Sequence, residues 1–395
     1  MNFSALQTYL DGLVRDGLPM AQIVVTKGRE VVFSHNAGHT DTEKTVPASD
    51  NTLCWCFSNS KVYTAVCLMR LVEEGKIGLD DPVSRYLPEY AEVSFLRDGA
   101  VCKTQKPVTI RQMITMTSGL SYKRRAEYPH FTEATAEPGV TTRRVAEALA
   151  KDVWDFEPGT DYVYGLGHDV IGAVIEVVTG MRFSEYMKQR IFDPLGIRDT
   201  GFHPDAEQLS RFAAMYRYDG TDCSFTPRAP INDFCFSENY DGGGAGLFSC
   251  PKEYRKLLTV LACGGTTEDG YRLLRPETIR QMATNQLNEK QLRAYRSDGV
   301  PKELSSGKLG YGYGLGVRVH MDPAQSGRKT SVGEFGWDGA AGAYSLVDPE
   351  KQLAVCYAEH VRHHVFEAAN PKSLDVYRMI HPTLTDLVCE AIENG

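Results

Sequence analysis

Residues 56–75 read CFSNSKVYTAVCLMRLVEEG, and the predicted fold turns on this segment. Before it, the β-rich runs AQIVVT and EVVFS are joined through Lys27-Gly28-Arg29, which predicts a hairpin. From about residue 58 helical patterns dominate, each ending at a glycine or a turn, and after about residue 309 the strand pattern returns. The chain therefore changes from strand to helix at this segment and back to strand near its end.

The two chain ends are predicted to build one sheet together. Near the C-terminus the runs YGYGLGVRV, GAYSLVD and KQLAVCYAEH have the composition of strands, and an apolar periodicity predicts a helix at each end of the chain. We therefore expect an α+β fold (an α/β sandwich), with an antiparallel sheet flanked by the terminal helices and a large, mostly helical insert. Residues 1–57 and 300–395 would form the sheet part and residues 58–299 the helical part, with a site in the cleft between them.

The composition excludes several classes of function. The formal net charge of −8 argues against a nucleic-acid partner, because phosphate binding needs a basic face. The sequence has no apolar run of membrane-spanning length and no signal-peptide pattern at its start, so neither membrane insertion nor secretion is expected. The ten cysteines lack metal-ligand spacing and are typical of reduced core residues in a cytoplasmic protein. No metal and no cofactor are expected, and nothing in the sequence indicates an oligomeric state.

A Ser-x-x-Lys pair is the first candidate for chemistry. On a helix it places a hydroxyl and an amine on one face, where the amine can take the hydroxyl's proton. The sequence contains four such pairs: Ser58/Lys61, Ser249/Lys252, Ser305/Lys308 and Ser326/Lys329. Only Ser58 opens a long helical pattern, which we interpret as amphipathic, with an apolar face of Val62, Ala65, Val66, Met69 and Val72. On the pattern alone, a simple N-cap is an equal alternative for Ser58.

Five blocks of sequence, in order, carry a resemblance to a known family. They are CFSNSKVYTAVCLMRLVEEGKIGLDDPVSRYLPEY, VTIRQMITMTSGLSY, FEPGTDYVYGLGHDVIGAVIEVVTG, GGGAGLFS and EFGWDGAAGAYSLVDPE. With these blocks the chain resembles the superfamily of serine β-lactamases and penicillin-binding proteins. Within it, the chain is most similar to the esterase branch related to class C β-lactamases, the family VIII carboxylesterases. The resemblance implies a β-lactamase/transpeptidase-like fold.

The resemblance also implies catalytic roles. Ser58 matches the acylated nucleophile, Lys61 its first partner and Tyr164 the catalytic tyrosine. Lys61 would favour the tyrosine anion, so the two can share the role of base, and which of them receives the Ser58 proton is left open. Trp337-Asp338-Gly339 falls where β-lactamases carry Lys-Thr/Ser-Gly, which implies an oxyanion hole made of the backbone N–H groups of Ser58 and Ala340.

Departures from the family pattern bear on the substrate. Leu166 stands in place of the asparagine of Tyr-x-Asn, and Trp337 in place of the lysine that meets a carboxylate. Asp338 would add a negative charge beside Trp337, and Gly339 would allow a close backbone approach. A site without both recognition groups suits neutral or apolar esters better than penicillins. His168, four residues after Tyr164, would tune the tyrosine or line the pocket, with a structural role as the alternative.

The predicted function is therefore a carboxylesterase acting on small-molecule esters through an acyl-enzyme on Ser58. The alternatives are an acyltransferase that uses an alcohol acceptor, a β-lactamase or D,D-peptidase, and a catalytically silent binding protein of the same fold. Tyr122, Tyr240 and Trp55 are candidate pocket-lining aromatic residues, with core packing as an equal alternative.

Overall fold

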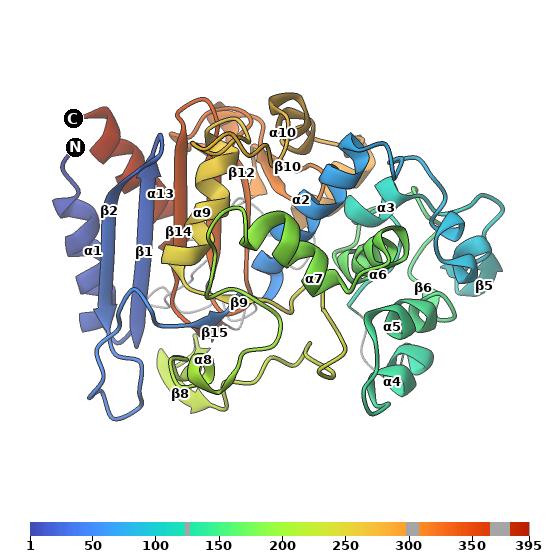
Figure 1. Ribbon diagram of the computed structural model, residues 1–395, viewed down its shortest axis with the longest axis horizontal. Coiled ribbons are helices and arrows are strands. Elements are labelled where there is room, and N and C mark those ends of the chain that lie inside the picture. The colour runs from blue at the N-terminus through green and yellow to red at the C-terminus, as the bar shows by residue number, and fades with distance from the viewer. Residues whose placement is uncertain (123–126, 298–307, 364–379, 395) are drawn as a thin grey trace.

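A seven-stranded antiparallel sheet dominates the computed structural model, which describes residues 1–122, 127–297, 308–363 and 380–394 (Figure 1). The strand order is β10-β11-β12-β13-β14-β1-β2. The N-terminal hairpin joins the C-terminal strands through β1 and β14, whose register places Val24 opposite Cys356. The predicted sheet from both chain ends is thus confirmed. The strands are β1 (Met20–Lys27), β2 (Glu30–Gly38), β10 (Tyr311–Tyr313), β11 (Arg318–His320), β12 (Phe335–Asp338), β13 (Tyr344–Asp348) and β14 (Leu353–Ala358).

Helices cover both faces of this sheet. The terminal helices α1 (Ser4–Arg15) and α13 (His381–Glu393) lie side by side on one face, where Leu10 and Val388 pack with Ile23 and Val355. Helix α9 (Pro251–Ala262) lies on the opposite face, in front of β14 and β1 in Figure 1. It belongs to the stretch that we assigned to the helical part, yet it covers the sheet. The division of the chain into two parts stays a prediction.

Helix α2 (Ser60–Glu73), which follows the candidate nucleophile, is central to the molecule. It contacts β12 on one side and α6 (Gly167–Thr179) on another. Tyr63 and Leu68, on faces that we expected to be polar, are as fully buried as Val62 and Val66. The interpretation of this segment as an amphipathic helix was therefore wrong. An apolar periodicity identifies one face of a helix that is buried. It does not tell whether other elements cover the remaining faces as well.

The remaining elements surround α2 or extend from the sheet. The helices are α3 (Ile110–Ile114), α4 (Pro129–Thr135), α5 (Thr142–Leu149), α7 (Phe183–Met187), α8 (Ala206–Leu209), α10 (Pro276–Met282), α11 (Glu289–Ser297) and α12 (Pro323–Ser326). Small sheets are formed by β3 (Cys54–Trp55) with β9 (Phe248–Ser249), by β4 (Ser94–Arg97), β5 (Ala100–Lys103) and β6 (Val153–Trp154), and by β7 (Met215–Asp219), β8 (Ser224–Arg228) and β15 (Val361–His363).

The run YGYGLGVRV is not the single strand that its alternation predicts. It folds back on itself, so that β10 and β11 form a hairpin with Tyr311 opposite His320. Gly316 in the turn has φ of 82°, in the left-handed region that glycine adopts at little cost. A Cβ atom on Gly314 would lie 2.0 Å from the carbonyl oxygen of Met282. The glycines that looked like part of a strand therefore serve the turn.

Among the described residues, no helix has the length and apolar character needed to cross a bilayer. The cytoplasmic location stays a prediction.

Candidate active site

Ser58 lies in a single 3-10 turn, Phe57–Asn59, that runs directly into α2. Phe57, just before it, has φ of 45°, in the left-handed region. Such a conformation costs about 1–3 kcal/mol and persists only where packing imposes it, and here Phe57 is buried in a cluster with Leu53 and Phe248. Ser58 stays partly exposed between the buried residues Phe57 and Asn59. The turn thus leaves Ser58 partly exposed while its neighbours are buried.

Lys61 lies beneath this hydroxyl and is fully buried. Its Nζ donates hydrogen bonds to Ser58 Oγ (3.3 Å), to the Tyr122 hydroxyl (3.0 Å) and to the carbonyl oxygen of Gly244 (2.7 Å). Burial lowers the pKa of Lys61 from its ordinary 10.5 to about 7, because the charged form loses its hydration. A large fraction of Lys61 is therefore neutral at physiological pH and able to accept a proton.

Tyr164 completes the predicted trio. Lys61 Nζ lies 4.7 Å from the centre of its ring, and Trp337 Nε1 donates a hydrogen bond to its hydroxyl across 2.9 Å. Burial raises the pKa of Tyr164 above its usual range, and hydrogen bonds with Ser58 and Trp337 offset only part of that rise. We expected Lys61 to favour the phenolate form of Tyr164. Burial instead raises the pKa of Tyr164 by more than the hydrogen bonds with Ser58 and Trp337 lower it. Tyr164 therefore keeps its proton at neutral pH.

Tyr122 belongs to the same cluster. The Tyr122 hydroxyl accepts a hydrogen bond from Lys61. The centre of the Tyr122 ring lies 5.5 Å from that of Tyr164 and 5.6 Å from that of Phe234. Burial raises the pKa of Tyr122 well above its usual range. The sequence marked Tyr122 only as a candidate pocket residue. Its contact with Lys61, 61 positions away, could not be read from local pattern.

The glycine-rich segment Gly242–Gly246 lies behind Lys61, between α2 and α6. Besides the bond from Lys61 to Gly244, the Gly243 carbonyl accepts from Thr64 Oγ1 at 2.6 Å. A Cβ atom on Gly243 would lie 2.4 Å from the carbonyl oxygen of His168, so a side chain has no room there. The segment is therefore a packed support for α2.

The end of β12 meets the nucleophile turn. A Cβ atom on Gly339 would lie 2.2 Å from the carbonyl oxygen of Cys56, so only glycine allows this approach. Asn59 Oδ1 accepts a hydrogen bond from Ser345 Oγ at 2.6 Å, which fastens the turn to β13. Ala340 follows Gly339 and packs against the cluster that contains Phe57. This arrangement supports the expected position of Ala340 beside Ser58.

Leu166 and His168 are both buried. Leu166 is 2% exposed and packs in the main core. His168 is fully buried, next to Gly316, and burial together with the charge of Lys61 lowers its pKa well below its usual value. The expectation that these two residues contact substrate is not supported by their placement. The match to the family pattern predicted where Leu166 and His168 lie along the chain. It did not predict where their side chains point.

Asp338 likewise lies away from the nucleophile. Its carboxylate pairs with Arg318 (3.1 Å) and with Nδ1 of His381 on α13 (3.2 Å). Adjacent residues of a strand point to opposite faces, so Trp337 faces Tyr164 while Asp338 faces the terminal helix. The expected negative charge beside Trp337 is therefore on the other side of the sheet, where Arg318 balances it.

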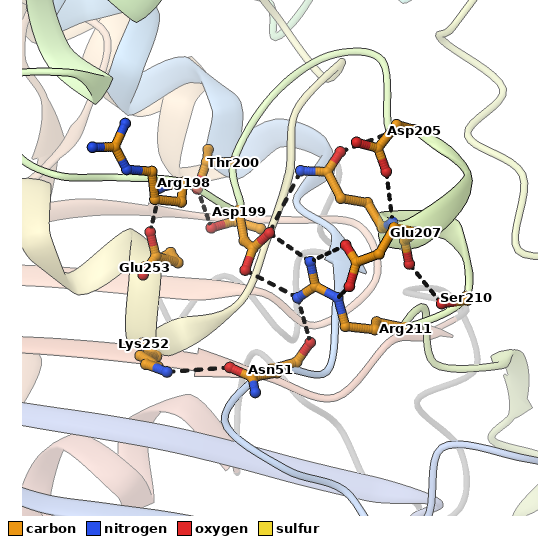
Figure 2. Close-up of polar contacts among 12 residues, drawn as sticks. Asn51, Arg198, Asp199, Thr200, Asp205, Glu207, Ser210, Arg211, Lys252 and Glu253 are labelled. Carbon is orange, nitrogen blue, oxygen red and sulfur yellow. Dashed lines mark hydrogen bonds and ion pairs between the residues drawn. The ribbon is translucent and has the colours of Figure 1, made fainter.

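The two other Ser-x-x-Lys pairs that the structure describes in full, Ser249/Lys252 and Ser326/Lys329, do not form a comparable site. Lys252 donates to Asn51 Oδ1 at 3.1 Å (Figure 2). Ser249 Oγ lies 2.7 Å from Thr200 Oγ1, within hydrogen-bond distance. In the same cluster, Asp199 and Arg211 form an ion pair at 2.6 Å (Figure 2). We interpret the cluster as a structural network of polar contacts near the surface. Lys329 pairs with Glu390 at 2.8 Å, and Ser305 lies outside the described residues. Ser58 with Lys61 is the pair that geometry favours.

The remaining aromatic candidates have structural partners. Tyr240 donates to a carboxylate of α6, Asp169, at 2.7 Å, and Trp55 Nε1 donates to the carbonyl oxygen of Pro230 at 2.8 Å. Within the described part of the chain, no group of three or more His, Cys, Asp or Glu side chains is placed to hold a metal ion.

Comparison with known proteins agrees with this geometry. The family model described as Beta-lactamase matches residues 6–376. The chain belongs to the beta-lactamase family. This membership confirms the predicted family and the prediction of a serine hydrolase. In this family member, the chain of contacts from Ser58 through Lys61 to Tyr122 and Tyr164 is the candidate catalytic centre.

Individual relatives and solved structures are similar to this chain over most of its length. Esterase EstB of Burkholderia gladioli is 29% identical over 357 residues, which cover 85% of this chain and 84% of EstB. Simvastatin synthase from Aspergillus terreus has a similar structure, with a TM-score of 0.79, 22% identity and 100% of each chain covered. A family VIII carboxylesterase has a TM-score of 0.72, 20% identity and coverage of 98% of this chain and 97% of its own. The two structural likenesses establish the fold.

Proposed function

We propose that the protein cleaves carboxylic esters through an acyl-enzyme on Ser58. The observation that carries this proposal is the partly exposed Ser58 hydroxyl 3.3 Å from a buried Lys61 whose pKa is about 7. A nucleophilic serine needs a neighbouring base that is neutral at working pH, and Lys61 has that property.

In the proposed acylation, neutral Lys61 takes the proton of Ser58 while Oγ forms a bond to the ester carbonyl carbon. The electron pair of the carbonyl moves to its oxygen, which the N–H groups of Ser58 and Ala340 would bind. When this intermediate collapses, the leaving alcohol takes a proton from the cluster, and water later cleaves the acyl-enzyme by the same route. Tyr164, which keeps its proton, is placed to relay it between Ser58 and the alcohol.

The surroundings favour neutral or apolar esters. Trp337 occupies the place of the lysine that meets a carboxylate in β-lactamases, and Tyr313 packs against it at 5.1 Å. Tyr122 and Phe234 extend the aromatic wall on the other side of Tyr164. Such a wall binds acyl groups through apolar contact and offers no charge to a carboxylate. The name of the relative EstB, an esterase, agrees with this reading.

Transfer of the acyl group to an alcohol is a second candidate function. It is supported by the full-length structural likeness to simvastatin synthase. Hydrolysis and transfer share the acyl-enzyme and differ only in which hydroxyl attacks it. β-Lactamase or D,D-peptidase activity is disfavoured because Trp337 replaces the cation for a carboxylate.

Covalent labelling tests the nucleophile directly. A p-nitrophenyl alkylphosphonate is expected to add one organophosphonyl group per chain, detected by intact mass and mapped to the peptide containing Ser58. Ser58→Ala is expected to abolish both the adduct and ester turnover, whereas Ser249→Ala, in the competing Ser-x-x-Lys pair, is expected to retain both. Full activity in a folded Ser58→Ala protein would overturn the proposal.

A further inference from the structure

A buried carboxylate lies behind Lys61, on the side away from Ser58. Asp169, 3% exposed, is in the first turn of α6, and Gly244 connects it to Lys61. The Gly244 carbonyl accepts from Lys61 Nζ at 2.7 Å, and the Gly244 N–H donates to Asp169 Oδ1 at 3.2 Å. A Cβ atom on Gly244 would lie 2.5 Å from Asp169 Oδ2, so the two residues are in direct contact. A single residue thus bridges the amine and the carboxylate.

Only one of the two carboxylate oxygens of Asp169 accepts hydrogen bonds from the described residues. Oδ1 accepts from the Tyr240 hydroxyl (2.7 Å) and from Gly244, whereas Oδ2 has no hydrogen-bond partner among the described residues. A buried carboxylate with an unpartnered oxygen is unfavourable unless a cation is near. Burial raises the pKa of Asp169, and the charge of Lys61 is the largest effect that lowers it again. In return, Asp169 opposes the lowering of the pKa of Lys61 by burial.

Among the residues that the structure describes, the other titratable groups around Lys61 do not supply this negative charge. Tyr122 and Tyr164 keep their protons because burial raises the pKa of each, and His168 is neutral because burial lowers its pKa. Ser58 carries a charge only during the reaction. Of the titratable groups that the structure places around Lys61, Asp169 alone is a buried carboxylic acid linked to Lys61 through Gly244. The N-terminal turn of α6 adds a further field that favours its anion.

We propose that Asp169 is a positioning residue for the reaction, holding the Lys61 amine toward Ser58 through Gly244 and stabilising the ammonium that forms when Ser58 loses its proton. This inference rests on the proposed function of Ser58 and Lys61. The proton of Ser58 Oγ moves to Lys61 Nζ as Oγ bonds to the acyl carbon, and it later leaves with the alcohol oxygen. During that interval a positive charge exists on a buried nitrogen, where a nearby anion is most effective.

Asp169→Asn tests the charge with nearly unchanged shape. The measurement is the pH dependence of the second-order rate constant for acylation by p-nitrophenyl acetate. Without Asp169 the pKa of Lys61 falls further, so the neutral amine persists to lower pH and the acid limb of the profile moves down, by about one pH unit or more. The plateau falls at least about tenfold, because the ammonium is no longer stabilised. A loss of packing alone would lower the rate without moving the limb.

Asp152→Asn is the matched control. Asp152 is an equally buried carboxylate, 1% exposed, that accepts hydrogen bonds from the N–H groups of His130 and Phe131 at the start of α4. Its removal is expected to lower the melting temperature and leave the acid limb in place. Tyr240→Phe provides a second variant if Asp169→Asn does not fold. It removes the hydrogen bond from Tyr240 that stabilises the anionic form of Asp169. It is expected to move the limb in the same direction, by less.

The outcomes separate the two proposals. A folded Asp169→Asn protein with the wild-type acid limb and plateau, or an unmoved limb in Tyr240→Phe when Asp169→Asn does not fold, overturns the role of Asp169. Retained activity in Ser58→Ala would instead overturn the proposed function itself. An inactive Ser58→Ala protein together with an unshifted Asp169→Asn profile leaves the esterase proposal standing and rejects only this inference.

Discussion

The indole of Trp337 donates a hydrogen bond from Nε1 to the hydroxyl oxygen of Tyr164 across 2.9 Å, and the two rings lie 5.4 Å apart. In the sequence, Trp337 stands in place of the lysine that meets a carboxylate in β-lactamases. The structure gives it a polar role as well, because a donor to the phenol oxygen lowers the pKa of Tyr164 against the effect of burial. Trp337 thus contacts Tyr164 through both its ring and its indole N–H.

Trp337→Phe separates these two roles, since phenylalanine keeps an aromatic wall and loses the donor. We expect kcat/KM for p-nitrophenyl butyrate to fall by up to about tenfold, because a hydrogen bond between neutral groups contributes about 0.5–1.5 kcal/mol. The fall should lie mainly in kcat, which steady-state kinetics will resolve. Tyr313→Phe is the control, because it removes a buried hydroxyl next to Trp337 that makes no hydrogen bond to the described residues. A change confined to KM in Trp337→Phe would show that only the wall matters.

The pH profile of the wild-type enzyme follows from the three buried groups. Lys61 must be neutral to accept the Ser58 proton, so kcat/KM is expected to fall about tenfold per unit as the pH drops below its pKa of about 7. Above that pH the rate should stay level through pH 9, because Tyr122 and Tyr164 keep their protons. Ester hydrolysis measured from pH 5 to 10 checks this. A rate that continued to rise toward pH 10 would mean that Lys61 has an ordinary pKa.

Lys61→Ala and Tyr164→Phe are each expected to slow acylation by at least about a hundredfold. Because both residues serve one proton transfer with Ser58, the double variant should be little slower than the slower single variant. Pre-steady-state measurement of p-nitrophenol release gives the acylation rate of each protein. Losses that multiply in the double variant would contradict a shared proton-transfer unit.

The extent to which the sequence predicted this structure depended on how local each signal was. The hairpin of β1 and β2 and the helices α1 and α13 were predicted because short-range periodicity and a turn glycine define them. The hairpin of β10 and β11 was missed, since glycines at alternate positions looked like one face of a strand. Ser58, Lys61 and Tyr164 were found through ordered family blocks, and the structure places them in contact distance.

The misplaced and missed residues share a different cause. Leu166, His168 and Asp338 were assigned to the cleft by position, whereas burial and strand alternation direct their side chains elsewhere. The alternation of Trp337 and Asp338 on β12 was available in the sequence and would have separated them. Asp169 and Tyr122 could not be found in this way. Their roles depend on Lys61 and Gly244, which are brought to them only by the packing of α2 against α6.

Substrate selectivity provides the last prediction. The wild-type protein is expected to hydrolyse short-chain p-nitrophenyl esters and to show little turnover of benzylpenicillin or a D-Ala-D-Ala peptide, because Trp337 offers no charge to a carboxylate. Trp337→Lys should raise the ratio of kcat/KM for benzylpenicillin over that for the ester by roughly ten- to a hundredfold, the worth of one charged hydrogen bond.

Asp338 will not cancel this gain, because its carboxylate faces Arg318 and His381 on the other side of the sheet. Trp337→Met, a neutral side chain of similar length to lysine, controls for the loss of the indole and its hydrogen bond. Both variants should lose ester activity. Only Trp337→Lys should show a higher kcat/KM for benzylpenicillin than the wild-type protein. If the wild-type protein cleaves benzylpenicillin as efficiently as esters, the position of Trp337 does not set the substrate class, and the β-lactamase alternative replaces the esterase.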